Sequence, residues 1–442
     1  MARSQWGSRL GFILASAGSA IGLGAVWKFP YVTATQGGGA FLLIYLFICL
    51  TLGLILMATE MAIGRATHLG PIGAFRKLGN KKWAGIGIMG VLVAFLILSF
   101  YSVVGGWTVA YLGKAITGGI ANSTDPTTNG NLFTDFITDP LQPLIYHFIF
   151  GFLTLFTVVS GVEKGIERIS KYLMPILLIL MLILIGRAVS LPGAVEGLKF
   201  FLLPDFSKIT GATWLEALGL AFFSLSLGIG IMITYGSYVG PEAKLVSSAA
   251  WVILLTLLTC FLSGLMVLPA VFAFGFEPGA GPGLTFITMP AVFASMPFGH
   301  LLAALFFALL LVAALTSSIS LLEVLVSFLI DEFKVHRLKA GIIAFVLFFL
   351  LGIAASLSLG AWSSYTLFGY NIFDMLDKLT QNILMPLGEI LLTLFVAWWR
   401  WDKIKVQLCG GNDSVWLSFL RFALGVVIPV IIFVIFLQGI LG

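Results

Sequence analysis

Two short stretches of the sequence combine glycine with small and hydroxyl-bearing residues inside otherwise apolar segments. They are residues 17–24, AGSAIGLG, and residues 224–230, SLSLGIG. Glycine in a helix interior costs about 1 kcal/mol relative to alanine, so each stretch is a place where a helix can break. At a break, free N–H groups can face an anion and free carbonyl groups can face a cation. The chemistry that suits both is a carboxylate, such as that of an amino acid, beside a small cation such as sodium.

Close helix packing through small residues is the alternative explanation for each stretch. However, the two stretches fall in the first and the sixth apolar segments, which are corresponding positions in two five-helix halves. Backbone groups left unpaired at membrane depth are costly unless they line a cavity or bind a ligand. Interrupted helices at matching positions are typical of a midplane binding site in a transporter.

The composition places these stretches in a membrane protein. Hydrophobic residues make up 60% of the 442 residues and charged residues 10%, and the mean hydropathy is +1.09. A soluble domain carries roughly 25% charged residues, so lipid must cover much of this apolar surface. A helix needs about 20 apolar residues to cross the hydrocarbon core. The chain therefore predicts an all-α polytopic membrane protein with eleven transmembrane helices in a single transmembrane domain, residues 1–442.

The apolar runs between glycine, proline and charged residues predict where the spans lie. We expect them near 9–35, 39–65, 83–118, 142–162, 166–188, 214–238, 243–275, 298–332, 338–358, 363–399 and 414–440. The stretches 189–213 and 276–297 are polar or rich in proline and glycine, and we expect short surface helices there.

Basic residues predict the orientation of the spans. With the N-terminus in the cytoplasm, 18 of the 24 lysines and arginines fall on the cytoplasmic side. They are Arg3, Arg9, Arg65, Arg76, Lys77, Lys81, Lys82, Lys164, Arg168, Lys171, Lys244, Lys334, Arg337, Lys339, Arg400, Lys403, Lys405 and Arg421. This bias follows the positive-inside rule. An odd number of spans then places the C-terminus outside, and we expect a multi-pass protein of the plasma (cytoplasmic) membrane.

Other classes of function find little support in the residues. Cys49 and Cys260 lie in apolar runs and Cys409 in a charged loop, a distribution that favours packing over a disulfide framework. No basic stripe interleaved with aromatic residues is present, so we expect no nucleic-acid partner. The histidines, at positions 68, 147, 300 and 336, are scattered, and no nucleophile–base or metal-ligand spacing appears. An enzyme is therefore not expected.

Six short motifs accompany the two breaks in a fixed order. They are residues 20–24 (AIGLG), 28–30 (KFP), 37–41 (GGGAF), 60–65 (EMAIGR), 224–228 (SLSLG) and 315–318 (LTSS). With this set the chain resembles the neurotransmitter:sodium symporter family, in its bacterial amino-acid branch of eleven-helix type, over nearly its whole length. The resemblance implies two inverted five-helix repeats, helices 1–5 (about 9–188) and helices 6–10 (about 214–399). Helices 1 and 6 are broken, and helix eleven, about 414–440, is peripheral.

The resemblance implies one complete sodium site. Its ligands would be the carbonyl groups of Gly18, Ile21 and Ala313 and the hydroxyl groups of Thr316 and Ser317. Five oxygen atoms from a broken helix and a facing helix suit a hard cation, because they replace its water shell. The alternative for the hydroxyl groups is a hydrogen bond to a carbonyl of the preceding turn.

A second sodium site departs from the family pattern. Ala25 and Thr256 stand where the family has side-chain amides, which leaves Ala20, Ser224 and Thr256 as its contributors. Two strong ligands are therefore missing, and we expect one sodium ion per substrate.

The chloride position of the family is also altered. Tyr45 and Ser224 match it, but Leu220 and Cys260 replace a polar residue and a serine or carboxylate. We expect no chloride dependence.

By the same resemblance, twelve residues line the substrate site. They are Ala20, Gly22, Leu23, Gly24, Ile97, Tyr101, Phe223, Ser224, Ser226, Ile229, Ser317 and Leu321. Tyr101 would bind a carboxylate together with amides around 22–24, although a buried tyrosine hydroxyl also finds partners in ordinary packing. Gly22 stands where monoamine carriers have an aspartate, which favours a zwitterion. The remaining side chains are uncharged, so the pattern predicts a small hydrophobic or aromatic neutral amino acid.

The outer gate resembles that of the family. Lys28 and Asp377 match its charged pair, although the family's usual residue at position 28 is arginine, whose planar fork lysine lacks. Phe223 and Tyr101 would form an aromatic lid over the substrate.

The cytoplasmic gate resembles that of the family as well. Arg3 and Asp331 match its ion pair, with Trp6, Tyr238 and Glu323 nearby. Each charge could instead be a solvated helix end. As opposed pairs on two sides of the membrane, the gates suit alternating access.

Helices five and two each carry unusual residues. Gly165 and Pro175 weaken the inner end of helix five, which either unwinds to admit water to the sodium site or is simply kinked. Glu60 is a charge within a span, where a functional role is the default hypothesis. The resemblance implies that it holds the broken helix six.

A sodium-coupled symporter of hydrophobic amino acids is the function that the resemblance implies. An uncoupled channel or facilitator, a non-transporting amino-acid sensor, and proton coupling on the same fold are the alternatives.

Overall fold

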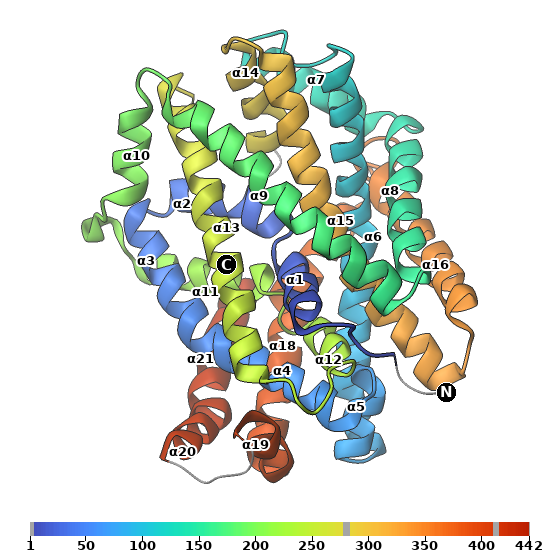
Figure 1. The fold of residues 1–442 in the computed structure, drawn as a ribbon. Coiled ribbons are helices and arrows are strands. Elements are labelled where there is room, and N and C mark those ends of the chain that lie inside the picture. The colour runs from blue at the N-terminus through green and yellow to red at the C-terminus, as the bar shows by residue number, and fades with distance from the viewer. Residues whose placement is uncertain (1–3, 277–282, 410–414, 442) are drawn as a thin grey trace.

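The structure is a computed structural model that describes residues 4–276, 283–409 and 415–441. Within these residues every regular element is a helix, and the helices stand side by side in one bundle (Figure 1). The predicted all-α class is confirmed.

Nine helical stretches in the described part of the chain are long and apolar enough to cross a membrane. Four of them are single helices: Gln142–Val159 (α8), Leu245–Ala273 (α13), Gly299–Phe333 (α15) and Arg337–Leu357 (α16). Two contain one long helix and a short preceding turn: Lys81–Ile116 with α6, Ala84–Ile116, and Val162–Val189 with α9, Arg168–Val189. Three are made of several helices in a row: Gly39–Thr67 (α3, Gly39–Ile48, and α4, Leu54–Thr67), Ile372–Leu408 (α17, Ile372–Lys378, α18, Met385–Leu394, and α19, Trp401–Cys409) and Leu417–Leu437 (within α20, Val415–Phe422, and α21, Ile428–Leu441). Each overlaps one predicted span.

Helix one is broken at the predicted glycine stretch. α1, Arg9–Ala20, and the following segment, Gly24–Thr35, which ends in α2, Phe29–Thr35, are bent by 54° at the break. Ile21 ends α1 with φ −86° and ψ 62°, and its N–H donates to the carbonyl of Ala17. The regular ladder of backbone hydrogen bonds therefore stops in the middle of this segment.

Helix six is broken as well. α11, Gly211–Ser224, and α12, Ile231–Gly236, are separated by six irregular residues, 225–230. Ser226, Gly228 and Gly230 have positive φ angles of 55°, 75° and 79°. Glycine adopts this conformation freely, but a serine persists there only where its surroundings hold it, at a cost of order 1–3 kcal/mol.

Short helices cover the ends of the bundle. They are α5, Pro71–Leu78, α7, Pro126–Thr138, α10, Ala194–Leu202, and α14, Met289–Ala294. α7 and α14 lie at the top of Figure 1, whereas α5 lies at the bottom with α19 and α20. α10 and α14 fall in the two stretches where surface helices were expected, but α5 and α7 were not predicted.

The predicted bounds of helix ten, 363–399, were wrong. The helix begins at Ile372 and continues to Leu408. Two hydrogen bonds explain the late start: Asn371 caps the helix by accepting from the N–H of Asp374 at 2.8 Å, and the hydroxyl of Ser358 accepts from the N–H of Phe373 at 3.1 Å. These capping groups fix the start of the helix at Ile372, whereas hydropathy alone predicts a start at residue 363.

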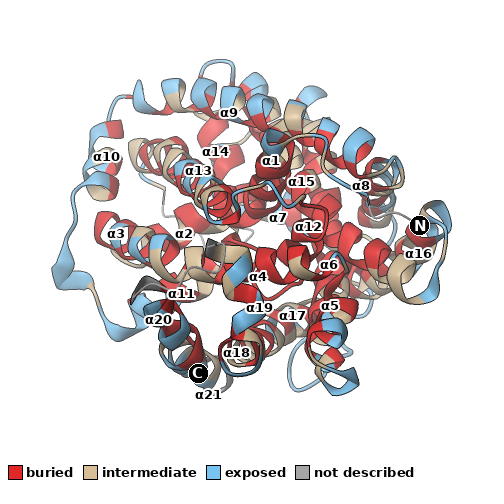
Figure 2. Cartoon of the chain, turned by 60° about the horizontal axis from the view of Figure 1, so that its bottom comes forward, coloured by how far each residue is buried: buried red, intermediate tan, exposed pale blue. Residues whose placement is uncertain are grey.

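The bundle is buried at its centre and apolar on its outer surface. In Figure 2 the central helices are red, and the outward faces of the peripheral helices are blue or tan. Large apolar side chains such as Phe156 of α8 and Ile179 of α9 are 64% and 56% exposed. Outward-facing residues of this kind are what a lipid bilayer covers.

Helices α4 and α12 approach closely because each carries a glycine at the contact. A Cβ atom on Gly64 would lie 1.9 Å from the carbonyl oxygen of Ile233, and one on Gly236 would lie 2.4 Å from that of Met61. No side chain fits in either place. This contact fixes helix two against the inner half of helix six.

Replacing Gly64 with valine is expected to lower the stability by roughly 1–3 kcal/mol, because the two backbones must separate. The midpoint of thermal unfolding of the purified protein measures the effect. Gly219→Val in α11 is the matched control, since no atom lies within 4 Å of a Cβ added there. Equal midpoints for the two variants would contradict the close crossing.

Candidate functional site

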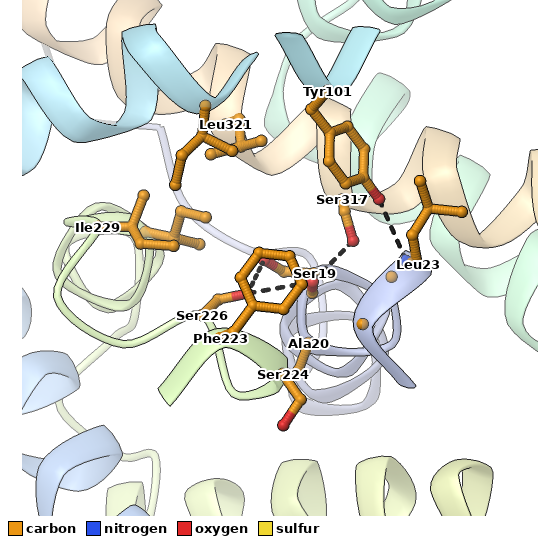
Figure 3. Close-up of a pocket in the computed structure, with 14 residues that line it drawn as sticks. Ser19, Ala20, Leu23, Tyr101, Phe223, Ser224, Ser226, Ile229, Ser317 and Leu321 are labelled. Carbon is orange, nitrogen blue, oxygen red and sulfur yellow. Dashed lines mark hydrogen bonds between the residues drawn. The ribbon is translucent and has the colours of Figure 1, made fainter. Parts of the chain in front are cut away.

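The breaks in helices one and six face each other across a cavity of about 380 Å³ (Figure 3). It is lined by Ser19, Ala20, Gly22, Leu23, Gly24, Ile97, Tyr101, Phe223, Ser224, Ser226, Ile229, Ile231, Ser317 and Leu321. All twelve residues that were predicted to contact substrate are among them. Ser19 and Ile231 were not predicted, although each lies beside a predicted residue at a helix break.

One side of the cavity is polar. The hydroxyl of Tyr101, on α6, accepts a hydrogen bond from the N–H of Leu23 at 3.3 Å. A Cβ atom on Gly22 would lie 3.0 Å from this hydroxyl and 2.3 Å from Oγ of Ser317. Only glycine leaves room here, so the backbone of the break, a phenol and a serine hydroxyl converge on one point. These donors suit a carboxylate.

The other side of the cavity is apolar. Ile97, Phe223, Ile229 and Leu321 line it, and Figure 3 shows Ile229 and Leu321 across the cavity from the break in helix one. None of the fourteen lining residues carries a charge. A charged group entering this side would be desolvated without a partner, which is costly.

Serine hydroxyls hold the two breaks together. The hydroxyl of Ser226 donates to the carbonyl of Ser19 at 3.1 Å. The hydroxyl of Ser19 lies 2.7 Å from that of Ser320 on α15. This contact explains why Ser226 keeps its left-handed conformation: its side chain spans from helix six to helix one.

Beside the cavity, the oxygen atoms of helices one and eight gather at the predicted sodium ligands. The hydroxyl of Ser317 lies 3.4 Å from the carbonyl oxygen of Gly18 and 2.8 Å from that of Ser19. A Cβ atom on Gly18 would lie 3.1 Å from Cβ of Thr316, so the two helices touch here. The hydroxyl of Thr316 lies 3.0 Å from the carbonyl oxygen of Ala313.

Four of the five predicted ligands are thus brought together, and Ile21, the fifth, stands at the break itself. Oxygen donors alone, with no nitrogen or sulfur, suit a hard monovalent cation. Thr316 also donates back to the preceding turn, so the hydrogen bonding considered as the alternative is present. The same hydroxyl oxygen can still accept a cation.

Comparison with known proteins decides the family. The profile of the sodium:neurotransmitter symporter family matches residues 3–131 and 143–442. The chain belongs to this family. A sodium-dependent transporter of Bacillus subtilis, YhdH, is 41% identical over 442 residues, which are 98% of this chain and 97% of its own. A sodium-dependent transporter of Methanocaldococcus jannaschii, MJ1319, is 34% identical over 98% of this chain and 89% of its own.

The fold has a close counterpart among solved structures of symporters. The crystal structure of MhsT in complex with L-phenylalanine superposes with a TM-score of 0.90 at 41% identity, covering 99% of this chain and 100% of that chain. The predicted family is confirmed. This symporter family consists of multi-pass, sodium-dependent membrane transporters, so the chain is a transporter and not an enzyme.

The second sodium position of the symporter is poor in ligands. The hydroxyl of Thr256 donates to the carbonyl of Val252, in its own helix, at 2.9 Å. The carbonyl of Ala25, on helix one, accepts from the hydroxyl of Ser263 at 2.8 Å. Ala20 and Ser224 line the cavity nearby. A serine from helix seven thus donates to a backbone oxygen of helix one.

The residues at the family's chloride position form a closed cluster. The hydroxyl groups of Tyr45 and Ser224 lie 2.5 Å apart, and the hydroxyl of Tyr45 lies 3.5 Å from the sulfur of Cys260. Leu220 is buried beside them in α11. The hydroxyl pair is satisfied internally.

The outer gate is joined through a third residue that was not predicted. Nζ of Lys28 donates to Oε1 of Gln381 at 2.9 Å, and Nε2 of Gln381 donates to Oδ1 of Asp377. Nζ of Lys28 also lies 4.9 Å from the ring centroid of Phe223, the lid residue. The glutamine amide, which both accepts and donates, relays between a lysine and a carboxylate that do not meet directly. Its position four residues after Asp377 is the signal that could have revealed it.

Replacing Gln381 with leucine is expected to loosen the outer gate. Hydrogen bonds to charged groups contribute about 1.5–3 kcal/mol, so the dissociation rate of bound substrate should rise roughly tenfold or more. The dissociation rate of labelled substrate measures this effect. Lys28→Met should give a similar increase, and the double variant should be no worse than either single one, because both remove the same relay. Strictly additive effects would contradict the relay.

The residues of the predicted cytoplasmic gate join the N-terminal segment to helices six and eight. Nε1 of Trp6 donates to the carbonyl of Tyr235 at 3.0 Å, and the N–H of Trp6 donates to the carbonyl of Tyr238 at 3.2 Å. The hydroxyl of Tyr238 donates to Glu323 at 2.6 Å, and Arg337 pairs with the same carboxylate at 2.5 Å. Arg337 was not predicted as part of this gate.

Of the predicted pair of Arg3 and Asp331, only Asp331 lies within the described residues. Arg3 lies outside the described residues. Asp331 accepts a hydrogen bond from the N–H of Gly70, at the start of α5, at 2.7 Å. Nearby, Glu167 of helix five accepts from the N–H of Gly7 and the hydroxyl of Ser8, both at 2.7 Å.

Helix five begins irregularly at the predicted glycine. A π-helical turn, Val162–Glu167, precedes α9, which continues through Pro175. A Cβ atom on Gly165 would lie 2.1 Å from the carbonyl oxygen of Thr157, so a side chain would push the turn away from α8. Met174 of the same helix would lie 3.3 Å from a Cβ atom on Gly18, which places helix five against the sodium ligands.

Glu60 lies where the resemblance implied. Its Oε1 accepts a hydrogen bond from the N–H of Gly228, in the break of helix six, at 2.8 Å. The carboxylate supplies a partner for an amide that the break would otherwise leave unpaired.

Proposed function

We propose that this chain is a sodium-coupled symporter that carries hydrophobic or aromatic neutral amino acids across the plasma (cytoplasmic) membrane by alternating access. The observation that carries the proposal is the uncharged cavity between two broken helices, with a cluster of cation-type oxygen ligands against it. An amino acid and a sodium ion that bind side by side in this way depend on each other energetically.

The chemistry of the cavity supports the choice of substrate. Its polar end offers the hydroxyl of Tyr101 and the backbone of residues 22–24 to a carboxylate, and its other end offers only apolar side chains and small hydroxyl groups. MhsT, the structural relative, is in complex with L-phenylalanine. One methylene group changes the preference of such a pocket by about 1–3 kcal/mol, so several hydrophobic amino acids should be accepted.

The proposed ion is one sodium per transport cycle, held by Gly18, Ile21, Ala313, Thr316 and Ser317, without chloride. The residues at the second position support a single sodium ion, because Ala25 and Thr256 stand where the family has side-chain amides. Tyr45, Ser224 and Cys260 satisfy one another at the position where chloride binds in the family.

The proposed architecture has eleven spans in two inverted five-helix repeats followed by one peripheral helix. The count adds the two broken helices to the nine continuous spans. The N-terminus is proposed to lie in the cytoplasm and the C-terminus outside, because α5 and α19, which are rich in basic residues, lie at the same end of the bundle (Figure 1).

Uptake into proteoliposomes tests the function. With an inward sodium gradient, labelled leucine, phenylalanine or tryptophan should accumulate above its outside concentration, and collapsing the gradient should release it. Equilibration without accumulation would identify a facilitator, and binding without uptake would identify a sensor. Accumulation that persists without sodium but requires a proton gradient would replace sodium by protons as the driving ion.

Reversal-potential measurements on the same proteoliposomes test the stoichiometry. One net charge should move per neutral amino acid, in the presence or absence of chloride. Two charges per amino acid would show that the second sodium position is occupied.

A further inference from the structure

Two glutamate side chains meet behind the break in helix six, on the side away from the substrate cavity. Glu60 of α4 and Glu389 of α18 are both fully buried and interact directly. They line a separate cavity of about 250 Å³. Its other lining residues are Pro71, Phe75, Ile86, Gly90, Gly228, Gly230, Ile233, Gly388 and Leu392.

Hydrogen-bond donors are missing at this pair. One oxygen of Glu60 accepts from the N–H of Gly228. In the described part of the chain, neither the other oxygen of Glu60 nor either oxygen of Glu389 has a hydrogen-bond partner. Buried polar groups are almost always partnered, so three unpartnered carboxyl oxygens in one cavity require an explanation.

A proton between the two carboxyl groups supplies the missing donor. Two ionised carboxylates in contact repel each other, and such a pair takes up one proton in common. Glu60 accepts from a backbone N–H, which favours its ionised form. Glu389 accepts no hydrogen bond and therefore carries the proton. Its O–H then donates a hydrogen bond to the second carboxylate oxygen of Glu60.

Among the described residues that line this cavity, none is basic. Lining residues such as Phe75, Ile233 and Leu392 are apolar, whereas a sodium ion needs several oxygen ligands to replace its water. The basic side chains of neighbouring elements are engaged elsewhere: Arg65 with Gln407 and Ala243, Lys77 with Thr67, Arg76 with Glu332, and Arg400 with Leu78. The lining residues other than the two glutamates carry no titratable group.

We propose that Glu60 and Glu389 form a proton-binding site that joins helix ten to the broken helix six. The site couples them because α18 is in direct contact with the break: a Cβ atom on Gly228 would lie 3.0 Å from the carbonyl oxygen of Met385. With the proton in place, Glu389 is a neutral donor to the residue that holds Gly228. When the proton leaves, two buried negative charges face each other and this contact opens.

Infrared spectroscopy of the full-length protein in lipid tests the proton directly. The wild type at neutral pH should show the carbonyl-stretch band of a protonated carboxylic acid in an apolar site. Glu389→Gln should remove this band, and Glu60→Gln should shift it. Glu196 is an exposed glutamate on α10, so the control variant Glu196→Gln should leave the band unchanged. Absence of the band in the wild type, or its persistence in Glu389→Gln, would overturn the proposal. So would a band that appears only when sodium is removed, because the pair would then hold sodium.

Transport as a function of pH tests the coupling. Wild-type uptake should fall as the pH is raised into the range in which the acid band disappears. Glu389→Gln keeps an N–H donor that cannot be released, so its uptake should resemble the wild type at neutral pH but lose this alkaline fall. Glu389→Leu has no donor and should lose about tenfold or more at every pH. An alkaline fall in Glu389→Gln that matches the wild type would show that the pair does not couple to transport.

Discussion

Replacing Thr316 with valine is expected to shift sodium-driven uptake of substrate to much higher sodium concentrations. The change keeps the shape of the side chain but removes the hydroxyl oxygen from the cluster at Gly18 and Ala313. A polar contact to a charged group contributes about 1.5–3 kcal/mol, so the sodium affinity should fall roughly 10- to 150-fold. The sodium concentration that gives half-maximal uptake of labelled amino acid measures the loss.

A matched substitution separates this effect from damage to the fold. Thr259 lies on α13, and its hydroxyl donates only within that helix, to the carbonyl of Leu255 at 2.9 Å. Thr259→Val should therefore leave the sodium dependence unchanged. Thr256→Val should do the same if one sodium ion is transported. A normal sodium dependence in Thr316→Val would show that the hydroxyl of Thr316 is not a sodium ligand.

Replacing Tyr101 with phenylalanine is expected to be the most damaging change to substrate binding. The hydroxyl of Tyr101 meets the N–H of Leu23 at the break of helix one and is the only side-chain hydroxyl of helix three that lines the described cavity. Its loss leaves the backbone amides as the main partners of a carboxylate. A hydrogen bond of this kind contributes about 1.5–3 kcal/mol, which corresponds to roughly 10- to 150-fold in affinity.

Equilibrium binding of labelled phenylalanine at saturating sodium measures this effect. Tyr111→Phe is the matched control: Tyr111 lies on the same helix, and its ring packs against Phe133, Phe286 and Phe307 away from the cavity. It should bind substrate as the wild type does. Equal affinities for Tyr101→Phe and the wild type would show that the carboxylate binds elsewhere.

The two helix breaks that border the cavity could be predicted from the sequence, because backbone groups left unpaired within a membrane are costly unless they line a cavity or bind a ligand. Glycines at 18, 22, 24, 228 and 230 weaken the helices that contain them, and both breaks occur in these two stretches. The facing residues from helices three and eight, Tyr101 and Ser317, were implied by the resemblance to the symporter family. All twelve expected lining residues consequently share one cavity.

Hydropathy alone could not predict contacts that depend on side-chain reach. Gln381 joins the outer gate because its amide spans the gap between Lys28 and Asp377, and hydropathy gives no sign of this relay. Arg337 reaches Glu323 from the first residue of α16. The partner of Glu60 was missed for the same reason: Glu389 lies more than three hundred residues later in the chain, and only the packing of α18 against the break brings the two together.

The dependence of substrate binding on sodium is the most direct test of the account, because it requires the ion and the amino acid to bind beside each other at the two breaks. The affinity of the purified protein for labelled phenylalanine or leucine should rise steeply with sodium and saturate, with a slope corresponding to one ion, and Thr316→Val should flatten this response. An affinity that stays the same when potassium or choline replaces sodium would contradict the shared site.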